Sequence, residues 1–143
     1  MAGTKNKGKL RHIAFAVHDL QKVANFYENS FGFTRVRESD VAVMLTDGLI
    51  SITLLHLPTN RNTEPDERGT DFIGLHHMGF QIDDIEEVSA AIEANGGTYH
   101  GQIKNVGAGK HSERKYRAPD GVVIDIVDLD HAEKVWKVPK PGE

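Results

Sequence analysis

The chain has 143 residues, of which 38% are hydrophobic and 27% are charged, and its formal net charge is −4. These values predict one globular domain with a buried core, and the negative charge argues against a nucleic-acid partner. Cysteine is absent, which excludes disulfides and thiol chemistry and favours a cytoplasmic location. No apolar run approaches the length of a membrane span, so we expect no membrane association.

The first half of the chain predicts a strand, a helix and three further strands. Residues 1–9 are polar and basic and predict a flexible N-terminal arm. The stretch LRHIAFAVHDL, from Leu10, predicts a strand that leads into a helix with Asp19 as its N-cap and Gly32 at its end. Three extended segments follow, and an Asp-Gly turn separates the last two.

The second half repeats this order. The stretch LHHMGFQIDDI aligns with the first strand at a fixed spacing, so that His12 and Asp19 fall on His77 and Asp84 (77 − 12 = 65). A second helix and three extended segments follow, and the last of these is VVIDIVDL. We therefore predict one pseudo-symmetric domain over residues 10–130, built from two βαβββ modules. Its segments are a first module at 10–57, a linker at 58–73, a second module at 74–130 and a C-terminal tail at 131–143.

Each of the two repeated strands carries a histidine on a face of small residues. A strand sends alternate side chains to opposite faces, so His12 shares its face with two alanines and His77 shares its face with Gly79. The bulky apolar side chains of both strands share the other face, which we expect to pack against the helices. The histidine face should therefore border an open space in a curved sheet.

Asp125 lies within the apolar final strand, where a buried carboxylate needs a partner. A metal ion would supply that partner. Two imidazoles and one carboxylate form the general pattern of a catalytic divalent-metal site. We therefore predict one divalent ion (Zn, Ni, Co, Mn or Fe) held by His12, His77 and Asp125.

Three stretches together resemble the vicinal-oxygen-chelate superfamily, which contains glyoxalases, bleomycin-resistance proteins and extradiol dioxygenases. They are HIAFAVHDLQKVANFYENSFGF, HHMGFQIDDIEEVSAAIEANGG and KYRAPDGVVIDIV. The resemblance implies an α+β fold in which two βαβββ modules form a cup-shaped mixed β-sheet with helices on the outside. It also implies metal ligands at His12, His77 and Asp125, and a homodimer by analogy.

The sequence departs from the family pattern at two ligand positions. Asp125 stands where the family usually has Glu, and counting from the first Asp-Gly turn reaches Ile52, which cannot bind a metal. We expect water at this fourth position, with His56 as the alternative. Glu113 is a candidate general base and Tyr116 a candidate hydrogen-bond donor to substrate, but alternation leaves open which of them faces inward.

The leading functional hypothesis is a metal-dependent lyase or isomerase of the glyoxalase type. The metal would chelate two neighbouring oxygens of a small-molecule substrate and stabilise an enolate. The same residues are compatible with a dioxygenase or transferase of this superfamily. A third hypothesis is a protein that sequesters a drug-like compound without catalysis, which the two departures favour.

Overall fold

The computed structural model describes residues 8–56, 72–106 and 111–140, with backbone only for 102–106 and 111–112. Most of the predicted arm (1–9) and linker (58–73) lies outside these residues. Two modules have the same order of elements, as the sequence repeat predicts. The first comprises β1 (Lys9–Ala16), α1 (Leu20–Phe31), β2 (Thr34–Glu38), β3 (Ala42–Thr46) and β4 (Ser51–Leu55). The second comprises β5 (Gly74–Gln81), α2 (Ile85–Ala94), β6 (Thr98–Val106), β7 (His111–Arg117) and β8 (Val123–Val127), and α3 (Leu129–Lys134) follows.

The caps predicted from the sequence fix the two longer helices. The Asp19 carboxylate accepts a hydrogen bond from the backbone N–H of Lys22, and Asp84 does the same for Glu87, each at 3.0 Å. Gly32 ends α1 in the left-handed conformation (φ 75°), which a residue without Cβ adopts at little cost. None of the helices in the described ranges is long and apolar enough to cross a membrane.

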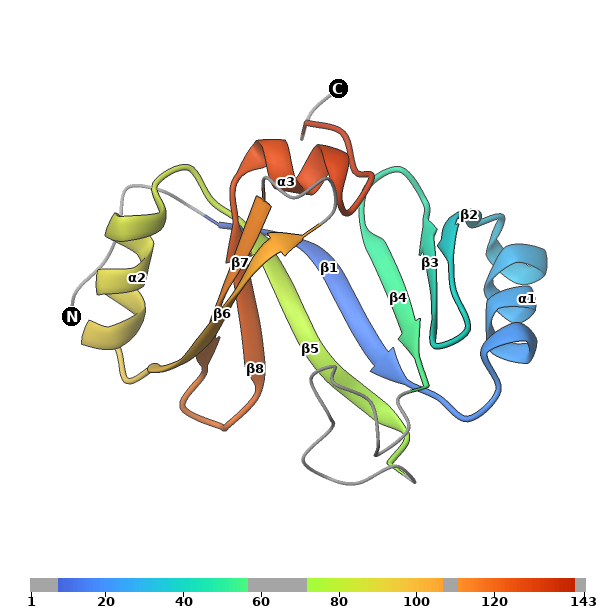
Figure 1. Cartoon of the computed structure of the whole chain (residues 1–143), viewed down its shortest axis with the longest axis horizontal. Coiled ribbons are helices and arrows are strands. Elements are labelled where there is room, and N and C mark those ends of the chain that lie inside the picture. The colour runs from blue at the N-terminus through green and yellow to red at the C-terminus, as the bar shows by residue number, and fades with distance from the viewer. Residues whose placement is uncertain (1–7, 57–71, 107–110, 141–143) are drawn as a thin grey trace.

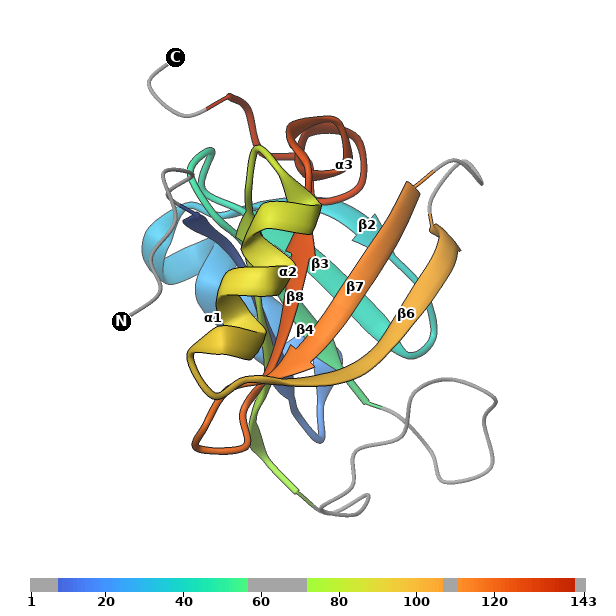
Figure 2. The same ribbon diagram turned by 90° about the vertical axis from the view of Figure 1, so that its left-hand side faces the viewer.

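All eight strands form one mixed sheet in the order β2-β3-β4-β1-β5-β8-β7-β6. The modules meet where β1 and β5 pair antiparallel, while β1 pairs parallel with β4 and β5 pairs parallel with β8. In Figure 1 the curved sheet has α1 and α2 at its two ends, and α3 lies between them. The turned view in Figure 2 shows the strands curving beneath α3. The predicted α+β fold, with a cup-shaped sheet and outer helices, is confirmed.

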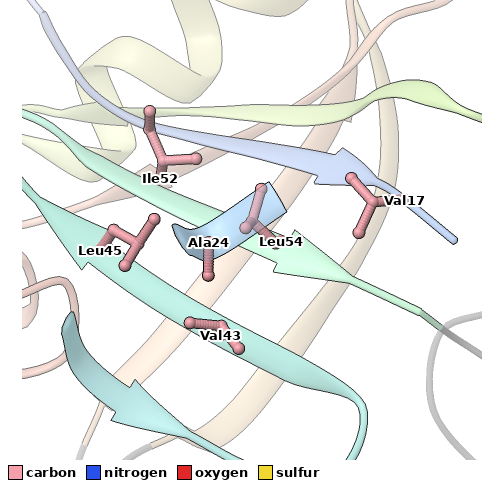
Figure 3. Packing of buried hydrophobic residues seen from close by; sticks show 6 residues of the cluster. All are labelled: Val17, Ala24, Val43, Leu45, Ile52 and Leu54. Atoms are coloured by element: carbon pink, nitrogen blue, oxygen red, sulfur yellow. The ribbon is translucent and has the colours of Figure 1, made fainter. Parts of the chain in front are cut away.

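The outer face of the sheet carries one core cluster for each module. Under α1, apolar side chains from β3 and β4 pack against Ala24, as Figure 3 shows. Under α2, Val88 packs against side chains of β7 and β8 that include Tyr116 and Ile126. This outer cluster fixes the alternation of β7, so Glu113 and Lys115 face the inside of the cup and Tyr116 does not.

The inner face is covered by the chain's own C-terminal segment. Trp136, Val135 and Val138 are buried against Met44 of β3 and Val127 of β8. The predicted boundary at residue 130 therefore cuts through α3, and the segment that follows is part of the domain. The expected open space over the small residues is filled at Gly79, where an added Cβ would lie 2.5 Å from the Trp136 ring.

The strand register gives Thr53, and not Ile52, as the first-module counterpart of Asp125. Ala14 of β1 pairs with Thr53, just as Gly79 of β5 pairs with Asp125. Ile52 lies on the outer face, in the core under α1. The fourth family position thus carries a hydroxyl group, one residue further along than counting from the turn predicts.

Candidate functional site

The structure brings together the three residues that the sequence analysis singled out. His12, His77 and Asp125 project inward from the adjacent strands β1, β5 and β8. The imidazole rings of His12 and His77 are 5.4 Å apart between centroids, and His77 Nε2 lies 3.4 Å from Asp125 Oδ2. Asp125 is fully buried, and His12 is nearly so. A buried polar cluster therefore sits where the two modules meet.

Lys115 completes this cluster and is the residue that the sequence reasoning missed. Its Nζ lies 2.7 Å from Asp125 Oδ1, and its side chain is only 4% exposed. The two residues are direct register partners on β7 and β8. The signal was present in the sequence, because the turn at Asp120-Gly121 sets this register once the strand pair is taken as a hairpin. The fully buried carboxylate therefore has a positive partner within the chain itself.

The side chains next to both histidines fix the orientation of their rings. Ser51, on the neighbouring strand β4, places its Oγ 2.5 Å from His12 Nδ1. His76 Nδ1 lies 2.8 Å from His77 Nδ1, which leaves His77 Nε2 on the side of Asp125. One face of the His12 ring is stacked on Trp136, with centroids 4.8 Å apart and planes 13° apart. His12 is thus held between a hydroxyl and an indole.

Glu113 links the cup to α3 and the segment after it. Its Oε2 lies 3.1 Å from His131 Nε2 and accepts a hydrogen bond from the Trp136 indole N–H at 3.3 Å. Burial by itself would raise the pKa of Glu113, but the hydrogen bond from His131 and the charge of Lys115 outweigh it and lower that pKa. Glu113 is therefore an ionised acceptor at neutral pH, on the face where a base would be needed.

Both histidines are held in the neutral form at pH 7. Burial lowers the pKa of His12 to about 4, with the charge of Lys115 acting in the same direction and that of Glu113 against it. Burial, His12 and Lys115 together lower the pKa of His77 well below its usual range. Each imidazole can therefore accept a hydrogen bond or a proton through one ring nitrogen.

Two other predicted site residues lie away from the cluster. Tyr116 is buried on the outer face under α2, so its position does not support the prediction that it donates to a substrate in the cup. His56 is exposed beyond the end of β4, and its Nδ1 lies 3.1 Å from the carbonyl oxygen of Val17. His56 therefore does not fill a ligand position beside His12 and Asp125.

The side chains present do not fit the divalent metal that the family resemblance implies. Within the residues that the structure describes, no three His, Asp or Glu side chains are grouped so that they could hold a metal ion. One oxygen of Asp125 is bonded to the Lys115 ammonium, and Trp136 covers one face of the His12 ring. The hydroxyl of Thr53, at the fourth position, adds no negative charge.

Comparison with known proteins places the chain in one family. Residues 9–126 match the sequence model of the Glyoxalase/Bleomycin resistance protein/Dioxygenase superfamily. An alignment 91 positions long, which covers 56% of this chain, shows 33% identity to the mitochondrial methylmalonyl-CoA epimerase of Homo sapiens. The matched part spans 49% of that relative, so the chain covers only about half of its length.

Solved structures share the fold. A hypothetical protein from Bacillus halodurans superposes with a TM-score of 0.64 at 23% identity, over 87% of this chain and 95% of the other. The methylmalonyl-CoA epimerase of Mycobacterium tuberculosis superposes with a TM-score of 0.62 at 19% identity, over 99% of this chain and 93% of the other. The family match, which covers most of the chain, carries the assignment: this protein belongs to the glyoxalase, bleomycin resistance protein and dioxygenase superfamily.

Proposed function

We propose that this protein is an isomerase or lyase of the glyoxalase type that acts on a small oxygenated metabolite inside the cup. The observation that carries the proposal is the cluster of buried acid–base groups at the junction of the modules, which comprises two neutral imidazoles, the Lys115–Asp125 ion pair and the ionised Glu113. Buried titratable groups with shifted pKa values are typical of sites that transfer protons.

The proposed reaction begins with removal of a proton from a carbon next to a carbonyl group. Glu113 is the proposed base, because it is ionised and faces inward on β7. The negative charge then moves to the carbonyl oxygen, and a positive or hydrogen-bonding group placed beforehand stabilises this enolate. Lys115 is the positive group on the same face, two residues from Glu113. A proton delivered from water to the other face of the carbon, with loss of the first proton from Glu113 to solvent, completes an epimerisation.

The curated relative supports an epimerase-like reaction as the first one to test. That relative is named for methylmalonyl-CoA, a thioester with a C–H between two carbonyl groups. Such a carbon is acidic enough for a carboxylate base to act on it. We therefore propose substrates of this class, small acids or thioesters with a C–H next to a carbonyl, without fixing the acyl group.

Exchange of the substrate's hydrogen for deuterium tests the proposal directly. The protein is incubated in D₂O with methylmalonyl-CoA and with a set of small 2-oxo acids, and deuterium uptake is followed by mass spectrometry. We expect catalysed exchange in at least one compound, and a loss of about 10²-fold or more in Glu113→Gln. His56→Gln removes an imidazole outside the cup and should exchange at the wild-type rate.

The competing function is binding without catalysis. It is favoured by the departures at the metal-ligand positions, because Lys115 is already paired with Asp125 and Thr53 stands at the fourth position. If a compound of the set binds in the cup but no compound exchanges hydrogen, the enzyme proposal is wrong and sequestration replaces it.

We also propose a homodimer, which rests on the family resemblance, and a cytoplasmic location, which rests on the absence of cysteine. Sedimentation velocity of the full chain tests the dimer.

A further inference from the structure

We propose that the ammonium group of Lys115 occupies the cation position of this cup, so that the site is built to work without a divalent metal. The proposal concerns which cation the cup holds, and it stands whether or not the protein catalyses a reaction. It rests on the contacts of Lys115, on the charge balance at Asp125 and on the space around Asp125.

The ammonium group of Lys115 lies beside the Asp125 carboxylate, which is the group that would have to bind a metal ion. Lys115 Nζ is 2.7 Å from Asp125 Oδ1, and His77 Nε2 is 3.4 Å from the other oxygen of the same carboxylate. The position is set by the backbone, because Lys115 and Asp125 are register partners in a hairpin. A lysine on the outer face or one residue away along β7 would not reach this carboxylate.

The charge of Lys115 leaves no need for a second cation at the Asp125 carboxylate. Asp125 carries one negative charge and Lys115 one positive charge, both nearly or fully removed from water. The first-module counterpart of Asp125 is the hydroxyl of Thr53, and the other inward-facing carboxylate, that of Glu113, accepts hydrogen bonds from His131 and Trp136. A divalent ion between His77 and Asp125 would lie within a few ångströms of the ammonium group, and their repulsion would be weakly screened in this buried site. Binding of the ion would require Lys115 to leave.

The space around Asp125 also disfavours a divalent metal ion. Gly79 is the register partner of Asp125 on β5, and the Trp136 ring fills the volume above Gly79. The same ring is stacked on His12. An ion that bound His12, His77 and Asp125 together would have to enter beside this indole, which is almost fully buried.

Metal titration of the full chain tests the proposal with a readout that does not depend on activity. The protein is purified without chelator, its metal content is measured, and it is titrated with Co²⁺ and Zn²⁺ by calorimetry and by the visible absorption of Co²⁺. We expect no stoichiometric metal and no Co²⁺ spectrum. Lys115→Arg keeps the charge and should behave like the wild type. Lys115→Met removes the charge, keeps the stem, and should gain Co²⁺ binding, which His77→Gln in the same chain abolishes.

Two controls make each outcome decisive. Lys134→Met removes a lysine from the exposed ion pair with Asp130, and it should not create Co²⁺ binding. Lys115→Met/Asp125→Asn removes both charges, so it should fold without binding Co²⁺. If Lys115→Met folds only when Co²⁺ is added, the proposal is supported. If the wild type binds one equivalent of metal and Asp125→Asn or His77→Gln abolishes it, the proposal is overturned. It is also overturned if Lys115→Met folds and gains no metal binding.

Discussion

Gly79 and Trp136 fit together so closely that no other residue is accommodated at position 79 without movement. A Cβ at position 79 would lie 2.5 Å from the Trp136 Cη2 atom and 3.0 Å from the His12 Cβ atom. Because Gly79 of β5 has no side chain, the Trp136 ring can lie against this strand and close the cup. This contact joins the C-terminal segment to the junction of the two modules.

We expect Gly79→Ala to lower the free energy of unfolding by about 1–3 kcal/mol, because the added methyl group overpacks a buried site. Urea denaturation followed by circular dichroism measures this change. Gly79→Ala/Trp136→Phe should recover part of the loss, since the smaller ring no longer reaches the new methyl group. Equal losses in the presence and absence of Trp136 would show that the two residues do not interact.

Removal of the Ser51 hydroxyl and removal of the Thr53 hydroxyl, both on β4, should have different effects on the free energy of unfolding. Ser51 Oγ is bonded to His12 Nδ1, whereas the buried Thr53 Oγ1 has no hydrogen-bond partner within the described part of the chain. We expect Ser51→Ala to cost about 1–3 kcal/mol of unfolding free energy, because it leaves a buried ring nitrogen without its partner. Thr53→Val keeps the shape, removes only an unsatisfied group, and should be neutral or slightly stabilising.

These two variants control for each other, because both change the inner face of β4. They are compared by urea denaturation at pH 7. A loss of more than about 1 kcal/mol in Thr53→Val would mean that its hydroxyl has a partner in solution, and the assignment of an unsatisfied hydroxyl would then fail.

Stability should fall as the pH drops from about 6.5 to about 4. The pKa of His12 is about 4 in the folded protein and near 6.5 in an unfolded chain, so the unfolded chain binds more protons in this window. The contribution of neutral, buried His12 is complete above pH 6.5 and is lost as the pH falls towards 4, which amounts to about 3 kcal/mol. The lowered pKa of His77 acts in the same direction.

Urea denaturation at several pH values checks this dependence. His12→Gln should flatten the profile between pH 6.5 and 4, whereas His56→Gln, outside the cup, should keep the wild-type profile. Glu113 acts at lower pH, because a carboxylate with a lowered pKa stabilises the fold until the pH falls below its usual range. A wild-type profile that is flat between pH 6.5 and 4 would contradict the burial of neutral histidines.

Glu113→Gln should loosen α3 without unfolding the sheet. Glu113 Oε2 is the shared acceptor for His131 and Trp136, and the amide supplies a neutral oxygen in its place. We expect a loss of about 1–3 kcal/mol and faster amide hydrogen exchange in Leu129–Lys134 than in β1 and β5. Glu133→Gln, on the exposed side of α3, serves as the control and should leave the exchange rates unchanged.

Removal of metal ions should leave the wild type unchanged. Since Lys115 already balances Asp125, the midpoint of thermal unfolding should be the same in EDTA and in Co²⁺. Lys115→Met should be stabilised by Co²⁺, and EDTA should reverse the effect. A wild-type midpoint that rises with Co²⁺ and falls with EDTA would argue for a resident metal.

The fold could be predicted from the sequence because the repeat consists of local signals, namely helix caps and the alternation of side chains along strands. Asp19 and Asp84 cap their helices through their own side chains, and alternation within β1 and β5 separates the two faces. These signals depend on neighbours a few residues away. The approach of His12 and His77 also followed from the repeat, because equivalent strands bring equivalent positions to the centre of the sheet, whereas Asp125 was singled out as a carboxylate within the apolar final strand.

The site was predicted less completely because its other members depend on contacts between distant segments. The choice between Glu113 and Tyr116 as the inward-facing residue was left open, since β7 has bulky side chains on both faces and only the core under α2 decides between them. The place of Trp136 depends on a six-residue helix and an irregular segment that have no periodic pattern. The alternation of small residues predicted a space over Gly79, but it did not predict that Trp136 fills this space.

Trp136 is the single tryptophan of the chain, and it lies against His12 at the centre of the cup. Its fluorescence therefore comes from one known place and needs no label. Release of the C-terminal segment would move the indole into water and shift its emission to longer wavelength, whereas a compound that enters beside it would change the intensity. The protein thus carries its own optical reporter for the opening of the cup.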